Sequence, residues 1–209
     1  MIIIQCVPSG PLQTNAYLLA CSETREGVII DPAPGSSEPL IEKAKGIHIR
    51  GILLTHSHWD HIADVKKVKA FFDAPVFVHP ADRGNVICPG SDRLFLPIPI
   101  EGVEPDYDLH DQELIIVGHL KVKVLGTPGH TPGGVCFYLE QEKVLFSGDT
   151  LFKGSFGTLS FPTSNAEAMW ASLKQLNRLP SETVVYPGHG ASTTIGAEKW
   201  LAEAERLFS

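Results

Sequence analysis

The sequence has few cysteines, and none of them are spaced as a metal-binding or redox pair. Its 209 residues contain four, at positions 6, 21, 88 and 136, with no C-x-x-C spacing. This argues against a disulfide framework and against a thiolate zinc site, and it is typical of a reducing compartment. We expect Cys6 and Cys136 to be buried packing residues rather than catalytic thiols.

Basic runs and long apolar runs are also missing. No run of Lys or Arg is longer than Lys66-Lys67, and the formal net charge is −7, so nucleic acid is not expected as a partner. The start, MIIIQCV, has no basic segment, and its apolar run ends at Gln5. We therefore expect neither a signal peptide nor a membrane span. A cytoplasmic protein that acts on a small molecule is the default expectation.

The overall composition suits a globular protein. Hydrophobic residues make up 43% of the chain and charged residues 20%. With no repeat or internal linker, we expect a single domain over residues 1–209. A chain of this length buries roughly 70% of its unfolded surface and needs no metal to hold its core together. Any metal that it binds is therefore expected to be functional.

The order of apolar runs and turns predicts strands and helices in two similar halves. Strands are expected over 1–7, 15–22, 26–32, 51–55, 75–80, 113–129, 134–149 and 182–190. Helices are expected over 36–46, 63–72, 165–179 and 196–208, and an irregular loop over 84–110. This order predicts an α/β (α+β) protein in which two sheets lie back to back with helices outside.

The segment THSHWDH, residues 55–61, places three histidines and an aspartate directly after the apolar run GILL. In extended backbone His56 and His58 point to the same side, and Asp60 and His61 follow where the chain turns toward a helix. A pair of histidines alone would favour a solvated turn. Imidazole together with carboxylate is instead a donor set that zinc and iron accept, so this segment predicts a metal site.

Three later motifs each place one metal-ligating residue at the end of an apolar strand. They are His130 in GTPGHTPGG, Asp149 in VLFSGDTLF and His189 in VVYPGHG. Rigid strands that end at one sheet edge can aim such donors at a shared site. Seven donors exceed what one tetrahedral ion uses, and they suit two ions about 3.5–4 Å apart with a carboxylate and a hydroxide between them.

These motifs resemble the metallo-β-lactamase superfamily in their residues, order and context. Its signature H-x-H-x-D-H appears within THSHWDH, and the leading VIIDPAPG contains Asp31, which resembles the superfamily's supporting aspartate. The resemblance covers essentially the whole chain and implies the four-layer αββα sandwich. Within the superfamily, GPLQTNAYLL, GHTPGG, FSGDTLFKGSFG and YPGHG resemble short glyoxalase II-like hydrolases.

The resemblance also implies a role for each residue. The implied ligands of metal 1 are His56, His58 and His130; those of metal 2 are Asp60, His61 and His189; and Asp149 bridges them. Asp31 and Thr55 would hold the histidine loop, although a turn-forming Asp-Pro is the alternative for Asp31. Asp60 would also act in catalysis, orienting the hydroxide or accepting its proton. The implied cofactors are two divalent ions, zinc first, with iron and manganese as alternatives.

The activity implied by the resemblance is hydrolysis of an acyl thioester such as S-lactoylglutathione. A mononuclear iron persulfide dioxygenase is the main alternative, with His56, His130 and Asp149 as its iron ligands. Hydrolysis of another ester or of a phosphodiester is a third possibility. Hydrolysis of β-lactams is less expected, because Asp149 stands where many true β-lactamases have Cys or Ser.

One segment of the chain departs from the pattern of the glyoxalase II-like hydrolases. Where that group commonly has a basic residue, this chain reads GTLSFP, with Thr158 and Ser160. Lys153 and Arg93 are candidates to bind an anionic substrate group in place of that basic residue, and the alternative is that both are solvated surface cations.

Two positions are open for Trp59, which lies inside the histidine motif. Its side chain either packs beneath the loop or lines the substrate entrance.

Overall fold

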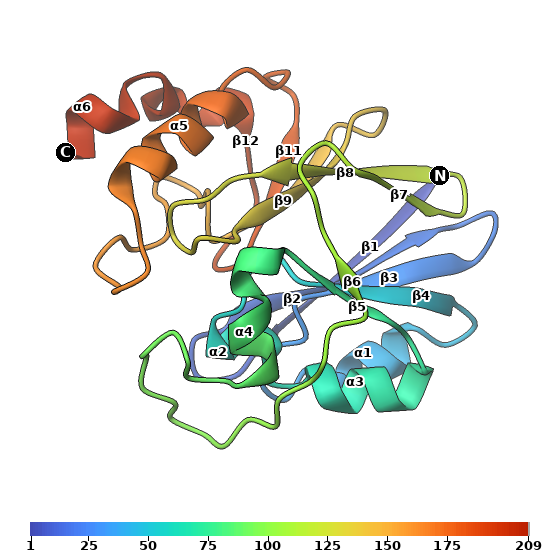
Figure 1. Cartoon of the computed structure of the whole chain (residues 1–209). Coiled ribbons are helices and arrows are strands. Elements are labelled where there is room, and N and C mark those ends of the chain that lie inside the picture. Colours follow the sequence, from blue (N-terminus) through green and yellow to red (C-terminus); the bar gives the residue numbers. More distant parts are fainter. Residues whose placement is uncertain (209) are drawn as a thin grey trace.

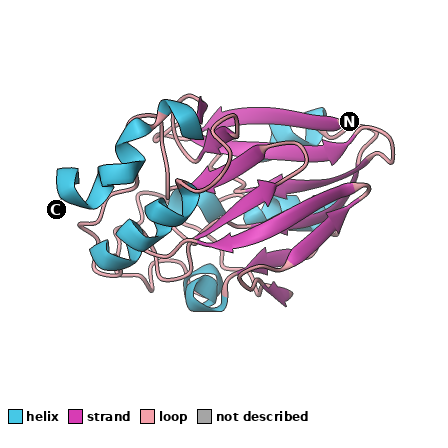
Figure 2. Ribbon diagram, turned by 90° about the horizontal axis from the view of Figure 1, so that it is seen from above, coloured by secondary structure: helices cyan, strands magenta, loops and turns pink. Residues whose placement is uncertain are grey.

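Two stacked six-stranded sheets form the centre of the molecule, which is a computed structural model describing residues 1–208 (Figures 1 and 2). In spatial order the first sheet contains β1 (Ile2–Ser9), β2 (Thr14–Cys21), β3 (Glu26–Ile30), β4 (His48–Leu53), β5 (Val76–Val78) and β6 (Tyr107–Asp108). The second contains β12 (Thr193–Thr194), β11 (Val184–Pro187), β10 (Val144–Gly148), β9 (Val135–Leu139), β8 (Leu120–Gly126) and β7 (Leu114–Val117).

The helices cover the outer faces of the sheets (Figure 1). Beside the first sheet are α1 (Ser37–Lys43), α2 (Trp59–Ile62), α3 (Val65–Phe72) and α4 (Pro80–Ile87). Beside the second are α5 (Ala166–Leu176), the 3-10 turns η1 (Ile195–Ala197) and η2 (Lys199–Glu203), and α6 (Ala204–Phe208). The predicted αββα arrangement is confirmed. No helix among residues 1–208 is long and apolar enough to cross a membrane.

Apolar side chains from both sheets fill the space between them. Leu19 and Ile30 of the first sheet belong to the same buried cluster as Phe137 and Phe146 of the second. Each fully buried side chain of this size contributes roughly 1.5–3 kcal/mol relative to an exposed one. Separate buried clusters join each sheet to its own helices. The strand ends are thereby held on a rigid frame.

Strand direction brings the predicted site residues to one edge. Strands β3, β4 and β5 run parallel, as do β10 and β11, so their carboxyl ends meet at the same edge of each sheet. Asp31 directly follows β3, and the histidine segment 55–61 follows β4. Asp149 directly follows β10, and His189 lies two residues beyond β11.

The structure corrects two of the predicted segments. Residues 84–87 are not loop but the end of α4, and residues 107–108 form β6, parallel to β5. The helix begins with His79 as its N-cap and Pro80 as its first residue, a start signal that was read as the end of a strand. The predicted helix over 196–208 is interrupted instead, as η1, η2 and α6.

One buried side chain explains that interruption. Glu198, 4% exposed, accepts hydrogen bonds from the Thr193 hydroxyl, the Trp200 indole and the Gly154 backbone N–H. These contacts tie the chain to the sheet edge and to a neighbouring loop, which competes with a continuous helix.

The prediction for the cysteines is confirmed for one residue and wrong for the other. Cys136, on β9 in the middle of the second sheet, is buried, whereas Cys6 is exposed. Cys6 lies on β1, the edge strand of the first sheet, where only Val7 is fully buried. An apolar residue on an edge strand has fewer neighbours to cover it.

Candidate metal centre

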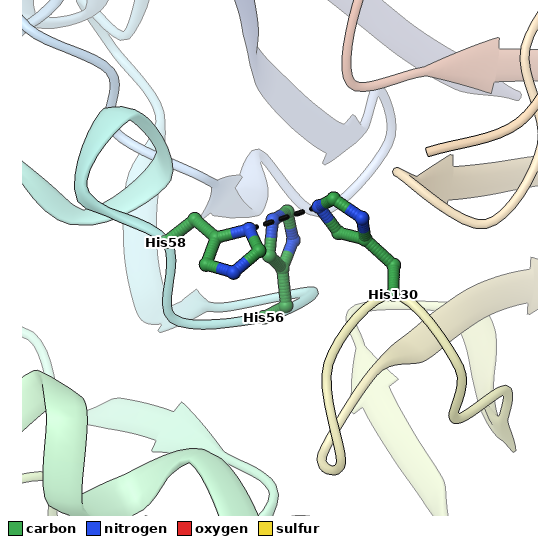
Figure 3. A group of neighbouring side chains, drawn as sticks. All are labelled: His56, His58 and His130. Carbon is green, nitrogen blue, oxygen red and sulfur yellow. Dashed lines mark hydrogen bonds between the residues drawn. The ribbon is translucent and has the colours of Figure 1, made fainter. Parts of the chain in front are cut away.

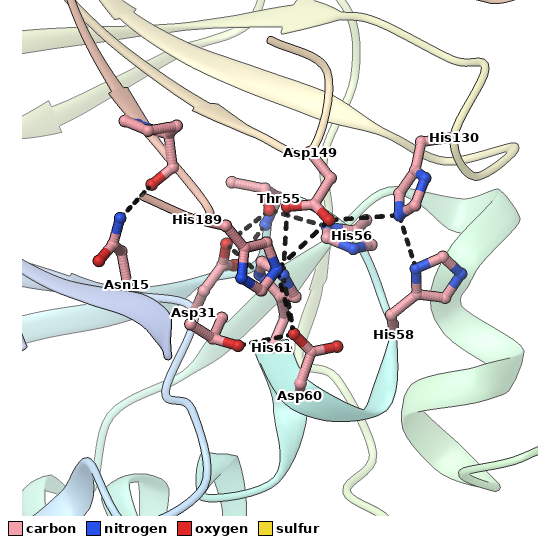
Figure 4. A network of polar contacts seen from close by, with 12 residues as sticks. Asn15, Asp31, Thr55, His56, His58, Asp60, His61, His130, Asp149 and His189 are labelled. Carbon is pink, nitrogen blue, oxygen red and sulfur yellow. Dashed lines mark hydrogen bonds and ion pairs between the residues drawn. The ribbon is translucent and has the colours of Figure 1, made fainter. Parts of the chain in front are cut away.

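All seven predicted metal ligands lie together where the two sheets end (Figure 4). The first sheet supplies His56, His58, Asp60 and His61 from the segment after β4, and the second supplies His130, Asp149 and His189 from the segments after β8, β10 and β11. Six of the side chains are buried, and His189 is partly exposed. Residues up to 133 positions apart (189 − 56) thus converge because the sheets stack.

The first group consists of His56, His58 and His130 (Figure 3). One nitrogen of each ring lies within 4.8 Å of the others. His58 Nδ1 is 2.8 Å from His130 Nε2, and the His130 ring is held at its other nitrogen, Nδ1, by the Thr158 carbonyl at 2.9 Å. Three converging imidazoles are a common ligand set of a catalytic zinc ion.

The second group consists of Asp60, His61 and His189. Asp60 Oδ2 lies 3.5 Å from His61 Nε2 and 3.3 Å from His189 Nε2. On the other side of the His189 ring, Nδ1 is 3.2 Å from the Leu12 carbonyl. Two imidazoles and one carboxylate thus converge at Nε2, Nε2 and Oδ2, which is a second common donor set for divalent metals.

The Asp149 carboxylate lies between the two groups. Its Oδ2 is 3.4 Å from His130 Nε2 in the first group and 3.5 Å from His189 Nε2 in the second. Its Oδ1 is 3.3 Å from His61 Nε2. Within residues 1–208, this one carboxylate therefore contacts ligand atoms of both groups, as a bridge between two ions requires.

Unpaired buried atoms test whether these residues fit metal ions. His56 Nε2, His61 Nε2 and Asp149 Oδ1 are buried and have no hydrogen-bond partner among residues 1–208. Buried polar atoms in proteins are almost always paired, so three unpaired atoms in one place need an explanation. Because the atoms are the nitrogens and oxygens that coordinate divalent metals, the residues fit such ions.

Burial and neighbouring charges set the protonation of the side chains. Burial lowers the pKa of His58 to about 3 and that of His56 well below its usual range, so both rings are neutral, as metal ligands must be. For His189 burial lowers the pKa, but the Asp149 and Asp60 carboxylates outweigh it and raise the pKa to about 9. Burial would raise the pKa of Asp60, but the charge of His61 lowers it to about 2.

These pKa values predict how metal binding depends on pH. His189 is protonated below about pH 9 in the metal-free protein, and a metal ion must displace that proton. The apparent affinity for zinc should therefore rise between pH 6 and 9, with protons released on binding. Calorimetry in buffers of different ionisation enthalpy measures the protons released. Affinity that does not change over this range would contradict the prediction.

Asp31 and Thr55 contact two of the histidines from behind. Asp31 Oδ1 accepts from the Thr55 backbone N–H at 2.8 Å, and Oδ2 accepts from the Thr55 hydroxyl at 2.5 Å. His61 Nδ1 lies 2.9 Å from Asp31 Oδ2, and His56 Nδ1 lies 3.1 Å from the Thr55 hydroxyl. With Nδ1 engaged, each ring turns Nε2 toward the proposed ions, which is the usual effect of such supporting contacts.

Thr14, Asn15 and Tyr17, from the motif GPLQTNAYLL, also support the centre, a role that the sequence did not predict. The Thr14 hydroxyl donates to Asp60 Oδ2 at 2.6 Å. The Asn15 side-chain amide donates to the carbonyls of Pro187 and Gly190, and the Tyr17 hydroxyl also donates to Pro187. These bonds hold the turn that carries His189. The run TNAY within a strand was the available signal, because polar residues there need buried partners.

Asp82 joins two of the loops that carry metal ligands. The sequence did not predict this role. The Asp82 carboxylate, 3% exposed, accepts from the backbone N–H of Ser57 at 2.9 Å and of Gly133 at 2.7 Å. Ser57 lies between two ligands of the first group, and Gly133 is three residues past the third. One turn along α4, Asn85 donates to the Ser57 carbonyl at 2.7 Å. Helix α4 thus fixes the spacing of the first group.

The substitution Asp82→Asn should weaken zinc binding roughly 10–100-fold, which is the usual loss of metal affinity when a residue that orients metal ligands is replaced. The amide would present N–H to one of the two backbone donors, so one loop would lose its anchor. Competition with a chelating indicator measures the affinity. His79→Ala is the control, because it removes only the cap of the same helix and should cost about 1 kcal/mol of stability with zinc affinity unchanged. Equal zinc affinity in wild type and Asp82→Asn would contradict the role.

The stacked sheets with buried His/Asp clusters at their shared edge define an αββα protein built to hold divalent metals. The chain belongs to the metallo-β-lactamase superfamily, whose family model matches residues 9–189. The fold and family are those of metal-dependent hydrolases.

Three similar proteins illustrate the range within the family. A hydroxyacylglutathione hydrolase of Haemophilus influenzae is 31% identical over 203 residues, 94% of each chain. The crystal structure of BLEG-1, described as a B3 metallo-β-lactamase, has a TM-score of 0.87 and 38% identity, covering 95% of this chain and 99% of that one. The structure of TTHA1623 in a di-iron-bound form has a TM-score of 0.81 and 39% identity, covering 93% and 96%.

Proposed function

We propose that this chain is a dinuclear metal-dependent hydrolase of acyl thioesters such as S-lactoylglutathione. The observation that carries the proposal is the position of the Asp149 carboxylate, within 3.5 Å of ligand atoms in both groups. In the proposed centre His56, His58 and His130 would hold one ion, Asp60, His61 and His189 would hold the other, and Asp149 would be shared.

Two such ions, when bound, lower the pKa of a bound water to about 7 and polarise a substrate carbonyl. We propose zinc as the metal, because three imidazoles and mixed imidazole and carboxylate sets are both typical zinc sites. Iron and manganese accept the same donors, and the di-iron form of a 39% identical protein supports iron as the principal competitor.

Asp60 is the proposed proton acceptor. Against the effect of burial, the charge of His61 lowers the pKa of Asp60 to about 2 and keeps it ionised at neutral pH, which suits it to orient the water and to hold the proton only briefly. The contacts from Thr14, His61 and His189 all engage Oδ2, which leaves Oδ1 to orient the attacking water and accept its proton. Asp60 is also among the residues that line the cleft at the proposed centre.

The similarity to the Haemophilus hydroxyacylglutathione hydrolase supports a thioester as the substrate class. Hydrolysis of another ester, of a phosphodiester or of a β-lactam would use the same proposed ions. Because the structure is similar to that of BLEG-1, a β-lactam should be assayed beside the thioester.

A mononuclear iron persulfide dioxygenase is the second candidate. The binding of iron by the similar TTHA1623 supports iron as the metal, although that structure holds two irons and this candidate uses one. His56, His130 and Asp149 would supply two imidazoles and one carboxylate, which is the set that oxygen-activating iron uses. The two candidates differ in metal number and in the consumption of oxygen.

The test of the proposed function uses protein stripped with a chelator and reloaded with zinc or iron. We expect hydrolysis of S-lactoylglutathione to be absent without metal and restored by two equivalents of it. Oxygen uptake with glutathione persulfide and hydrolysis of a β-lactam are measured on the same preparations. Oxygen uptake at one iron per chain, without thioester hydrolysis, would overturn the proposal in favour of the dioxygenase.

A further inference from the structure

The cleft above the proposed metal centre has mainly apolar walls. It is lined by His58, Asp60, His130, Asp149 and His189 at its base, and its walls include Leu12, Trp59, Leu94, Phe152 and Phe161. Trp59 is among the lining residues, as expected if it lies at the substrate entrance rather than packing beneath the histidine loop. A substrate that reaches the proposed ions must pass between these side chains.

An aromatic ring stands beside each metal-ligand group. The Phe161 ring centre is 5.1 Å from that of His58 and 5.6 Å from that of His130, in the first group. The Phe152 ring centre is 5.7 Å from that of His189, in the second. A substrate chain that leads away from the proposed ions would therefore meet an aromatic ring beside either group, and apolar groups are desolvated there at the least cost.

Away from the proposed metal centre, the cleft offers no basic side chain to a substrate carboxylate. No Lys or Arg lines it within residues 1–208. Lys153 and Arg93, the candidate cations, are both exposed and outside its lining. Thr158, which does line it, pairs its hydroxyl with that of Ser160 at 2.8 Å. Apart from the proposed ions and their ligands, the lining is therefore neutral, whereas recognition of an anion there would need a cation.

The volume of the cleft limits what can be enclosed. It measures about 140 Å³, below the roughly 300 Å³ at which pockets begin to enclose a drug-sized ligand. A short acyl chain fits such a space, whereas a tripeptide thiol does not. Most of a glutathione moiety would lie outside the walls.

Resting on the proposed thioester hydrolysis, we propose that the cleft selects thioesters with a short, apolar acyl group and makes no use of the carboxylates of glutathione. In the reaction the water oxygen bonds to the acyl carbon, the carbon–sulfur bond breaks, and the products are the carboxylic acid and the thiol. Selection rests on the aromatic and aliphatic walls, so the carrier thiol is left largely in solvent.

The test uses zinc-loaded protein and compares thioesters that differ in a single chemical group. Each kcat/KM is divided by the rate of hydroxide-catalysed hydrolysis of the same thioester, which corrects for differences in intrinsic reactivity. S-propanoylglutathione differs from S-lactoylglutathione only by lacking the hydroxyl. We expect the propanoyl thioester to be favoured at least about tenfold, as one polar group in an apolar pocket commonly costs. Replacing glutathione by N-acetylcysteamine, which has no carboxylate, should change kcat/KM less than about threefold. Preference for lactoyl, or a tenfold loss with N-acetylcysteamine, would overturn the inference.

Two phenylalanine variants test whether Phe161 causes the preference for the propanoyl thioester. Phe161→Ala should lower kcat/KM for the propanoyl thioester about tenfold and for the lactoyl thioester much less. Phe95→Ala is the matched control, because Phe95 is 85% exposed and lies outside the lining of the cleft. Equal effects of Phe161→Ala on both substrates would contradict a selective role for this ring.

Failure of the proposed function would be recognised separately. If zinc-loaded protein hydrolyses none of the thioesters, thioester hydrolysis itself is wrong. Calorimetry with non-hydrolysable thioethers then still tests the cleft: S-propyl-N-acetylcysteamine should bind more tightly than its 2-hydroxypropyl analogue. The opposite order would overturn the inference whatever reaction the centre performs.

Discussion

Asp149→Asn should remove at least one metal ion per chain and abolish measurable turnover, while leaving the two-sheet fold intact. The carboxylate has oxygen atoms within 3.5 Å of ligand nitrogens from both groups. An amide has no charge, and its nitrogen cannot coordinate in place of the lost oxygen. We expect a loss of activity larger than the roughly 10–100-fold caused by residues that only orient a ligand. Metal analysis and thioester hydrolysis on one preparation measure both effects.

Asp73→Asn is the matched control for this substitution. Asp73 is exposed at the end of α3 and lies outside the metal centre, so the same chemical change there should alter neither metal content nor turnover. Circular dichroism of Asp149→Asn should match that of the wild type, because the hydrophobic clusters do not depend on this residue. Two metal ions per chain in Asp149→Asn would contradict the bridging role.

Asp31→Asn should lower zinc affinity roughly 10–100-fold and also destabilise the metal-free protein. Asp31 is 2% exposed and accepts from the backbone and hydroxyl of Thr55 and contacts His61 Nδ1. Asparagine offers one acceptor oxygen in place of two, so a buried donor would be left unpaired at a cost of about 1–3 kcal/mol. Urea unfolding of the metal-free protein and zinc titration measure the two effects.

Backbone strain does not confound this test. Asp31 has a left-handed backbone, with φ of 49°, and asparagine is among the residues that tolerate that region. Asp73 has φ of 48°, so Asp73→Asn also controls for this conformation. If Asp31→Asn binds zinc as the wild type does, Asp31 is only the turn-forming residue of its Asp-Pro pair.

The sequence predicted the layers and the position of the centre because both follow from local patterns. Apolar strands that end in a ligand-type residue, as at Asp149 and His189, could be recognised one at a time. Their meeting at one edge follows from parallel strands in stacked sheets. The cluster geometry agrees with that expectation.

The residues that hold the ligands in place could not be predicted in this way. Asn15 donates to the Gly190 carbonyl 175 positions away, and Asp82 joins Ser57 to Gly133 from a helix whose end was read as loop. Such bonds depend on how the sheets stack, which no local pattern records. The interruption of the final helix by Glu198 has the same origin.

In the proposed centre two ions share the Asp149 carboxylate between two histidine groups. This arrangement can be tested by X-ray diffraction from crystals of the zinc-loaded protein, recorded above and below the zinc absorption edge. We expect two anomalous peaks per chain about 3.5–4 Å apart, one among His56, His58 and His130 and the other among Asp60, His61 and His189, both in contact with Asp149. A single peak at full zinc loading, or a peak that does not contact Asp149, would contradict the account.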